Sequence, residues 1–368
     1  PPGRWSVLSK ADDYPVHQRA EPIATAGTDR NFYDRYFFNA QAPDGSLFLA
    51  AALGVYPHLD VMDAAFAWME GDVQRSVFAS RRLGGERMDT AVGPVSVEVL
   101  QPLHRLKVRL DLTEGMRADI VFEGRHSPIA EPRFTWRLGP RTIMDATRMT
   151  QNIVATGAVH IKGQEHAVTS WLGTRDRSWG IRPIGAPDAQ PPAGTPQFFW
   201  LWLPLNFGRY CLYAHTNDDQ DGRGWNRSAR LVDLETGAEQ LLLSPVFGID
   251  WTPGTRRAAA ATLDAITEAG EPVRVRVMPE TSFHMHGLGY GHPRYAHGVW
   301  RGELDVAFET FDATEADPAT PLNAHVQALV RAEMRIDGGS PIPGRGVLEQ
   351  LVIGPHRPSG FREFFDLA

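Results

Sequence analysis

Apolar and polar residues alternate along much of this chain, and this period of two limits the fold more than any other feature of the sequence. In residues 330–337, Val, Ala, Met and Ile occupy the even positions, and Arg, Glu and Asp occupy the odd positions. Residues 104–112 and 273–277 repeat the pattern. Successive side chains on a strand point to opposite faces, so each segment can bury one face and expose the other. The pattern predicts antiparallel β-sheet.

Turn signals separate these segments. Asp44-Gly45 and Thr236-Gly237 each lie between two strand-like runs, which is typical of β-hairpins. Apolar stripes at helical spacing are scarce, and the best helical candidate is residues 258–266. We therefore expect mostly β structure with few helices.

The length of the chain, 368 residues, indicates about two domains. Around residues 184–196, Pro, Gly, Ala and Asp dominate and the alternation is lost, as in a linker. We expect an N-terminal β-domain at residues 1–185, a linker at 186–195 and a C-terminal β-domain at 196–368.

Composition excludes several classes of protein. The formal net charge of -7 argues against nucleic-acid binding, and no apolar run is long enough to span a membrane as a helix. Cys211 is the only cysteine, so the chain cannot form an internal disulfide, and residues 1–5 carry no signal-peptide pattern. We expect a cytoplasmic protein. Motifs of phosphate-binding loops and of serine hydrolases are absent from the sequence.

The most distinctive local motif is residues 173–182, which place Asp176 among Arg175, Arg177 and Arg182. A carboxyl group can donate or accept a proton near neutral pH if burial raises its pKa. On a strand, alternation points Arg175 and Arg177 away from Asp176, and Trp179 could form a wall of the site. Asp176 is thus a candidate general acid/base. The alternative is a structural aspartate that binds backbone N–H groups or an arginine.

Histidines cluster between residues 283 and 298. His284 and His286 would point to one face of a strand and could hold a metal ion together with His292, His297 or Glu280. The glycines of this segment also suit a hydrogen-bonding loop. We favour a role for His284 or His286 as a proton partner or ligand contact over a metal site, and we expect no metal and no cofactor.

An aromatic strand provides candidate pocket residues. Phe198, Trp200 and Trp202 share one face of a run that is apolar on both faces. Such a strand is either core or the wall of a hydrophobic cavity. Tyr213 and His215 share one face of the next strand and could add polar groups to that cavity.

Near the C-terminus, Glu349 and Gln350 are polar residues in an apolar strand, so we expect one of them to face a cavity. Surface exposure explains them equally well.

The motif at Asp176-Arg177-Ser178-Trp179-Gly180 resembles the Asp-x-x-Trp-Gly motif of the carotenoid hydratase (hydroxyneurosporene synthase) and AttH-like group. Residues 295–298 and 344–354 also resemble segments of bacterial relatives. The resemblance implies two calycin-like (lipocalin-like) antiparallel β-barrels or sandwiches in tandem. It also implies hydration or cyclisation of apolar, terpenoid-like substrates, with Asp176 as the motif acid.

These observations predict a cofactor-independent lyase or isomerase that hydrates, dehydrates or cyclises a small hydrophobic substrate. Asp176 would be the general acid/base, and water or substrate would be positioned by His284, His286, Tyr213 or His215. The pocket would be formed by Trp179, Trp200, Trp202 and Phe198. Two alternatives stay open: a non-catalytic binding protein for a lipid or terpenoid, and a metal-dependent enzyme centred on His284 and His286.

Overall fold

The computed structural model describes residues 8–17, 29–138, 141–185 and 196–368. Regular structure within these residues consists of strands and short 3-10 helices, without an α-helix. The expected all-β fold is confirmed. In the part of the chain that the structure describes, no helix is long and apolar enough to cross a membrane. The expected linker, residues 186–195, lies outside the described residues.

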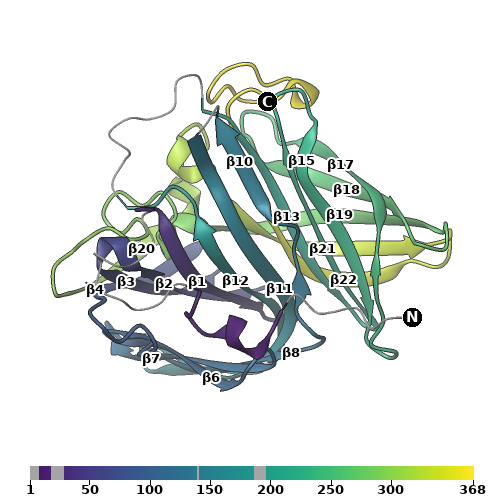
Figure 1. The fold of residues 1–368 in the computed structure, drawn as a ribbon. Coiled ribbons are helices and arrows are strands. Elements are labelled where there is room, and N and C mark those ends of the chain that lie inside the picture. The colour runs from purple at the N-terminus through teal and green to yellow at the C-terminus, as the bar shows by residue number, and fades with distance from the viewer. Residues whose placement is uncertain (1–7, 18–28, 139–140, 186–195) are drawn as a thin grey trace.

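The strands form two antiparallel sheets that each curve into a nearly closed barrel (Figure 1). The first sheet has thirteen strands. They are β1 (Phe32–Gln41), β2 (Leu47–Tyr56), β3 (Val61–Glu70), β4 (Val73–Arg82), β5 (Ala91–Val92), β6 (Val95–Gln101), β7 (Arg105–Thr113), β8 (Met116–Gly124), β9 (Ile129–Ala130), β10 (Phe134–Leu138), β11 (Arg141–Ile161), β12 (Gln164–Ile181) and β20 (Leu304–Asp312).

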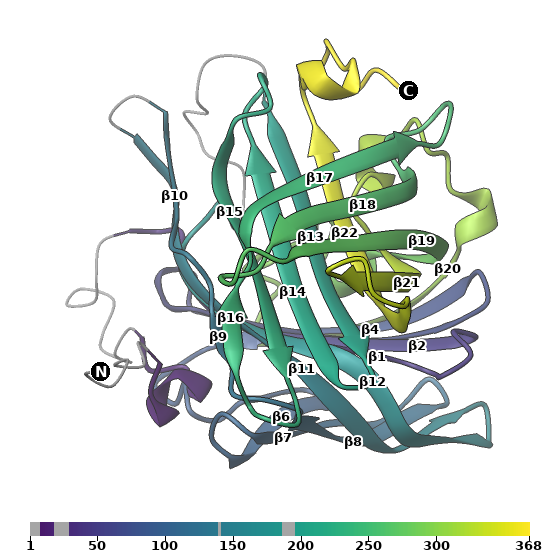
Figure 2. The same ribbon diagram turned by 90° about the vertical axis from the view of Figure 1, so that its right-hand side faces the viewer.

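The second sheet has nine strands, and β17, β18 and β19 cross in front of β13 and β14 in Figure 2. They are β13 (Phe198–Phe207), β14 (Tyr210–Asp218), β15 (Gly224–Asp233), β16 (Glu239–Leu241), β17 (Leu243–Trp251), β18 (Ala258–Ile266), β19 (Pro272–His284), β21 (Val326–Ile336) and β22 (Ile342–Ile353). The 3-10 helices are η1 (Lys10–Asp13), η2 (Pro57–Leu59), η3 (Met285–Leu288), η4 (Ala313–Glu315), η5 (Pro321–Asn323) and η6 (Arg357–Ser359).

The strand β20 belongs to the first sheet although it comes from the second half of the chain. It pairs with β4 along its whole length, from Leu304 opposite Arg81 to Asp312 opposite Val73. Figure 1 shows it beside β4, at the edge of the first barrel. The division of the chain at residues 185 and 196 stays a prediction.

Buried apolar side chains form three cores, one inside each barrel and one between the barrels. Adjacent residues of one strand belong to different cores. Phe38 lies in the core of the first barrel, whereas Phe37 lies in the core between the barrels. Because side chains alternate along a strand, the outer faces of β1 and β12 form one wall of the space between the barrels.

Both expected hairpins are present: Asp44-Gly45 joins β1 to β2, and Thr236-Gly237 joins β15 to β16. The expectation of a helix at residues 258–266 is wrong. This segment is β18, which pairs with β17 and β19. Ala261, Leu263 and Ala265 point into the second barrel, so burial of alternate residues and strand pairing override the helix propensity of alanine.

Candidate active site

The strand β12 divides the central motif between two faces. Arg175 and Arg177 are completely buried on the side of the first barrel, whereas Asp176 is half-buried on the face between the barrels. Asp176 pairs with Phe37 of β1 and Thr150 of β11 in the backbone register. The predicted separation of Asp176 from its two neighbouring arginines is confirmed.

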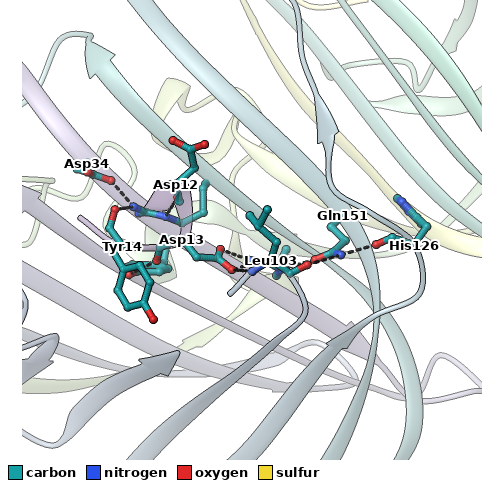
Figure 3. Close-up of polar contacts among 10 residues, drawn as sticks. Asp12, Asp13, Tyr14, Asp34, Leu103, His126 and Gln151 are labelled. Carbon is teal, nitrogen blue, oxygen red and sulfur yellow. Dashed lines mark hydrogen bonds and ion pairs between the residues drawn. The ribbon is translucent and has the colours of Figure 1, made fainter. Parts of the chain in front are cut away.

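The two arginines hold residues 8–17, which we call the N-terminal strap. Arg175 donates to the Asp13 carboxylate, with 2.6 Å between Nη1 and Oδ1. Arg177 donates to the backbone oxygens of Asp12 and Tyr14 at 3.2 and 3.0 Å. Figure 3 shows the strap residues between Asp34 on one side and Leu103 on the other. These arginines therefore serve the structure of the first barrel.

Trp179 lies on this barrel side as well. Its ring stacks on His17 of the N-terminal strap, with 3.7 Å between ring centroids. His17 in turn contacts Asp34, which also binds Arg177 at 2.6 Å. Burial would raise the pKa of Asp34, but Arg177 and His17 hold it below its ordinary value. The structure thus does not bring Trp179 together with Asp176, because an odd number of positions separates them along the strand.

Charged groups from both sheets surround Asp176. Burial, with smaller effects of Glu131 and Glu349, raises the pKa of Asp176 to about 7 against the opposing effects of Arg148 and Arg182. Among the described residues, no hydrogen bond or ion pair is formed by the Asp176 carboxyl group. Asp176 is therefore a carboxyl group that can gain and lose a proton near neutral pH.

Glu131 and Arg148 form the nearest polar layer. Arg148 Nε lies 3.9 Å from Glu131 Oε2, and the hydroxyl of Thr150 donates to Glu131. Burial raises the pKa of Glu131 although Arg148 opposes this shift. The guanidinium carbon of Arg148 lies 4.9 Å from the ring centroid of Trp200, which is a cation–π contact.

The predicted aromatic residues lie on the same face. Trp200 and Trp202 are almost fully buried, and the Trp202 ring lies edge-on to Phe37, with centroids 6.2 Å apart. Phe198 is half-buried, and its ring lies 6.2 Å from that of Trp136. The two tryptophans are thus core between the barrels, and Phe198 has accessible ring surface.

Tyr213 and His215 support this layer from β14. The Tyr213 hydroxyl lies 2.5 Å from His215 Nδ1, and His215 Nε2 lies 2.8 Å from Asn226 Oδ1. The Tyr213 hydroxyl also interacts with Glu131, and burial together with Glu131 raises the pKa of Tyr213 well above its ordinary value. Burial lowers the pKa of His215 to about 3. Both side chains are completely buried, so they back the site and do not line it.

A carboxylate–histidine pair on the second sheet was missed by the sequence analysis. Glu349 Oε1 lies 2.9 Å from His325 Nε2, and it accepts a hydrogen bond from Trp200 Nε1 at 3.0 Å. Because a carboxylate only accepts, Nε2 of His325 carries the proton and Nδ1 is left as the basic nitrogen. Burial would raise the pKa of Glu349, but His325, Gln327 and Arg148 hold it below its ordinary value.

That Glu349 faces a cavity stays a prediction, but its side chain does lie on the face between the barrels, where it contacts Trp200 and His325. Glu349 and His325 retain 12% and 11% of their side-chain exposure on the face between the barrels. Gln350 points to the other face, where its Oε1 accepts from the backbone N–H of Ala258 at 2.8 Å.

A chain of hydrogen bonds joins this pair to β12. Thr174 donates its backbone N–H to Asn39 Oδ1 at 2.8 Å, and Asn39 Nδ2 donates to Gln327 Oε1 at 3.0 Å. Gln327 Nε2 donates to Glu349 Oε2 at 2.7 Å. The strand that carries Asp176 is thereby fixed against the strand that carries Glu349.

A cleft of about 760 Å³ is linked to this region by Tyr290, which lines it and whose ring packs edge-on against His325. Its lining includes Arg182, Tyr290, His297, Ile143 and Ile184. Asp176 does not line the cleft. Arg182 connects the cleft with the surroundings of Asp176, because it lines the cleft and also lowers the pKa of Asp176. The volume is within the range of pockets that hold small organic ligands.

His284 and His286 lie elsewhere. His284 exchanges backbone hydrogen bonds with the Gln74 side chain of β4, four strands from β12, or about 19 Å at the usual strand spacing. His284 Nε2 lies 3.4 Å from the Arg257 guanidinium, and the His286 ring packs edge-on against Phe311. Across the described residues, no group of three or more His, Cys, Asp or Glu side chains could hold a metal ion. The structure does not bring these histidines together with Asp176.

Sequence reasoning did not identify Glu131 and Arg148 as neighbours of Asp176, or His325 as the partner of Glu349. Each is a single charged or polar residue in or next to an alternating strand, which is the normal pattern of a solvated face. Only the pairing of β11 with β12, and the packing of the second sheet against them, turns these side chains toward one another.

A family profile and two solved structures are similar to this chain. The profile of a family of unknown function (DUF8625) matches residues 8–362. A Nitrosomonas europaea protein that has been assigned as an AttH has a similar crystal structure, with a TM-score of 0.53 and 14% identity, covering 88% of this chain and 94% of that chain. Kievitone hydratase from Nectria haematococca aligns with a TM-score of 0.49 and 11% identity, covering 88% of this chain and 89% of that chain. No curated protein sequence matches this chain.

The similarity to the Nitrosomonas europaea protein is a similarity of fold, since only 14% of the aligned residues are identical. It confirms the expected AttH-like fold of two tandem barrels. The family profile covers nearly the whole chain. The chain therefore belongs to the family of unknown function DUF8625.

Proposed function

We propose that this protein is a cofactor-independent lyase or isomerase that hydrates, dehydrates or cyclises a hydrophobic, terpenoid-like substrate between the two barrels. One arrangement carries the proposal. Asp176, half-buried and without a bonding partner among the described residues, faces an aromatic core, and a carboxylate–histidine pair stands on the facing sheet. Acid–base catalysis usually uses two such groups, one that donates a proton and one that accepts a proton.

In the hydration direction, Asp176 donates its proton to one carbon of a double bond. Water adds to the other carbon and releases a proton to Nδ1 of His325, which Glu349 holds in position through Nε2. The step leaves an alcohol, an Asp176 carboxylate and a His325 imidazolium. Return of the proton to Asp176 through solvent completes the cycle, and dehydration is the reverse sequence.

The aromatic residues have two different roles in this proposal. Phe198 offers accessible ring surface to an apolar substrate. Trp200, Trp202, Tyr213 and His215 are buried behind the wall and exclude water from it. A low-polarity wall raises the pKa of a neighbouring carboxyl group and so keeps a proton available on Asp176.

The direct test is incubation of the purified protein with isoprenoid alkenes and tertiary alcohols in heavy-oxygen water, followed by mass spectrometry. We expect label incorporation or loss of water with the wild type, and neither with Asp176→Asn of unchanged circular dichroism. Equal turnover by the variant excludes Asp176 as the acid. A compound that is bound by the protein and recovered unchanged favours the alternative of a non-catalytic binding protein.

A further inference from the structure

Arg182 is a partly buried cation with no acidic partner in the part of the chain that the structure describes. Among the described residues, no carboxylate lies within ion-pair distance of its guanidinium group, and its buried Nε has no hydrogen-bond partner. Its Nη2 lies 2.9 Å from His297 Nδ1, and its guanidinium carbon lies 4.4 Å from the ring centroid of Tyr33. The group is thus held in place by neutral contacts only.

Other buried arginines on β1 and β12 differ in this respect. Arg175 pairs with Asp13 at 2.6 Å, Arg177 with Asp34 at 2.6 Å, and Arg35 with Asp63 at 3.1 Å. Removing a guanidinium from water is unfavourable unless an anion and hydrogen-bond acceptors compensate. Arg175, Arg177 and Arg35 each have such an anion, whereas the described residues provide none for Arg182.

His297 leaves Arg182 free to bind another group. Burial, together with Arg35 and Arg182, holds the pKa of His297 well below its ordinary value, so this histidine is neutral. Its Nε2 lies 3.0 Å from the backbone oxygen of Leu288, which places the proton on Nε2 and leaves Nδ1 to accept from Arg182. The histidine orients the guanidinium without neutralising its charge.

Arg182 also stands at an opening of suitable size. It lines the cleft of about 760 Å³ together with the apolar side chains of Ile143, Pro183 and Ile184. Arg30 and Arg141 line the same cleft but have partners of their own, so the argument rests on Arg182 alone.

We propose that the cleft binds an anionic group, a carboxylate or a phosphate, on an otherwise apolar substrate, and that Arg182 is the residue that receives it. This inference rests on the proposed function, because it names the class of substrate that would react at Asp176, with the anionic end in the cleft at Arg182, whose charge acts on Asp176. A guanidinium presents parallel N–H donors that match two oxygens of a carboxylate or phosphate. The apolar side chains beside it contact the hydrocarbon part of the molecule.

The test measures binding of three matched probes by calorimetry: geranic acid, geranyl phosphate and geraniol. For the wild type we expect at least one anionic probe to bind about tenfold more tightly than geraniol, a preference that weakens as salt is added. Arg182→Gln should remove the preference and leave the affinity for geraniol within about twofold, and Arg182→Lys should retain part of it. Whichever anion binds more tightly identifies the head group.

The matched control is Arg133→Gln. Arg133 is an exposed arginine that pairs with Asp145 at 2.6 Å and does not line the cleft, so its replacement should leave all three affinities unchanged. Equal affinity of the wild type for all three probes overturns the proposal. An equal loss for all three probes in Arg182→Gln and Arg182→Lys also overturns it, because it identifies a purely structural arginine.

Failure of this inference and failure of the proposed function give different results. Binding requires no turnover, and Asp176→Asn should keep the preference for anionic probes because Arg182 is intact. A retained preference without any chemical change of the probes leaves the anion site standing and removes the catalytic proposal. Turnover of isoprenoids without a preference for anions does the reverse.

Discussion

Asp13 and Arg175 form a buried ion pair, with 2.6 Å between Oδ1 and Nη1, although 162 positions separate them in the sequence. The pair anchors the N-terminal strap to the strand that carries Asp176. Arg175 therefore has a structural role on one face of β12, while its neighbour Asp176 faces the candidate active site.

Replacing Asp13 should destabilise the protein strongly. Asp13→Ala leaves the Arg175 guanidinium buried without its carboxylate, which typically costs about 3–5 kcal/mol. Urea unfolding measures the effect. Asp111→Ala is the control, because Asp111 is 74% exposed and its ion pair with Arg109 is at the surface, so its loss should change the free energy of unfolding by less than about 1 kcal/mol. Equal effects of the two substitutions would contradict the anchoring role.

Asp176 should make folding less favourable at high pH. Its pKa is raised from 3.8 to about 7, so the folded protein holds a proton that the unfolded chain releases. Stability contributed by this proton is present below about pH 4 and is lost as the pH rises to about 7. At pH 8, Asp176→Asn should be more stable than the wild type by about 1–3 kcal/mol. Urea unfolding at pH 8 and pH 5.5 measures this difference, which should shrink at the lower pH; a constant difference would argue against a raised pKa.

His284 and His286 should have the opposite pH dependence. Burial lowers their pKa values from 6.5 to about 3 and about 4, so the unfolded chain takes up protons that the folded protein excludes. Stability is therefore lost as the pH falls below about 6.5, by up to about 1.4 kcal/mol per pH unit for each histidine. His284→Gln should reduce this slope between pH 7 and pH 5. A slope that is unchanged in His284→Gln would contradict this account.

Substitutions at Glu349 and at its neighbour Gln350 test the proposed base, with Gln350 as the control. Glu349→Gln removes the anion that orients His325, and we expect kcat to fall about 10²–10³-fold with loss of the low-pH limb of the pH–rate profile, which a general base produces. His325→Gln should have a similar effect, and the double variant should lose little more. Gln350→Ala removes an acceptor on the other face and should lower stability while leaving the pH–rate profile unchanged. A normal pH profile for Glu349→Gln would exclude the pair from catalysis.

Substitutions of Trp179 and Phe198 should have different effects, one on stability and the other on ligand binding. Trp179 stacks on His17 of the N-terminal strap, so Trp179→Leu should lower stability and leave the affinity for geraniol unchanged. Phe198 has accessible surface between the barrels, so Phe198→Ala should weaken geraniol binding by about tenfold. Calorimetry and urea unfolding of both variants check the assignment, and the reverse result would place the ligand on the barrel side of β12.

The sequence predicted what depends on a single strand. Alternation placed Asp176 opposite Arg175, put Trp200 and Trp202 on one face, and made Glu349 a candidate for an inward position. It also shows, once the strand is established, why Trp179 cannot face the same way as Asp176: three positions separate them. Trp179 was placed beside Asp176 because the sequence did not show that the strand continues as far as Trp179. Once the strand includes both residues, the odd spacing puts their side chains on opposite faces.

What the sequence could not supply depends on packing between strands and sheets. His284-x-His286 is real as a local pattern, but β19 ends at His284 and the next residues form η3 beside β4, away from β12. Arg148 and Glu131 lie near Asp176 because β11 pairs with β12, and His325 meets Glu349 on the second sheet, which packs against these strands. Residues 258–266 became a strand because β17 and β19 supply its hydrogen-bond partners, and no local propensity encodes those partners.

The position of β20 has a consequence for biosynthesis. During translation, β4 leaves the ribosome roughly 220 residues before β20, which is about ten to forty seconds at ordinary elongation rates. During that interval, β4 of the nascent first barrel has no partner on one side. A β20 strand from another polypeptide made on the same messenger RNA could pair with it. Slow synthesis of the second half should therefore favour exchange of β20 between polypeptides, and a nascent chain released before residue 304 should depend on chaperones to stay monomeric.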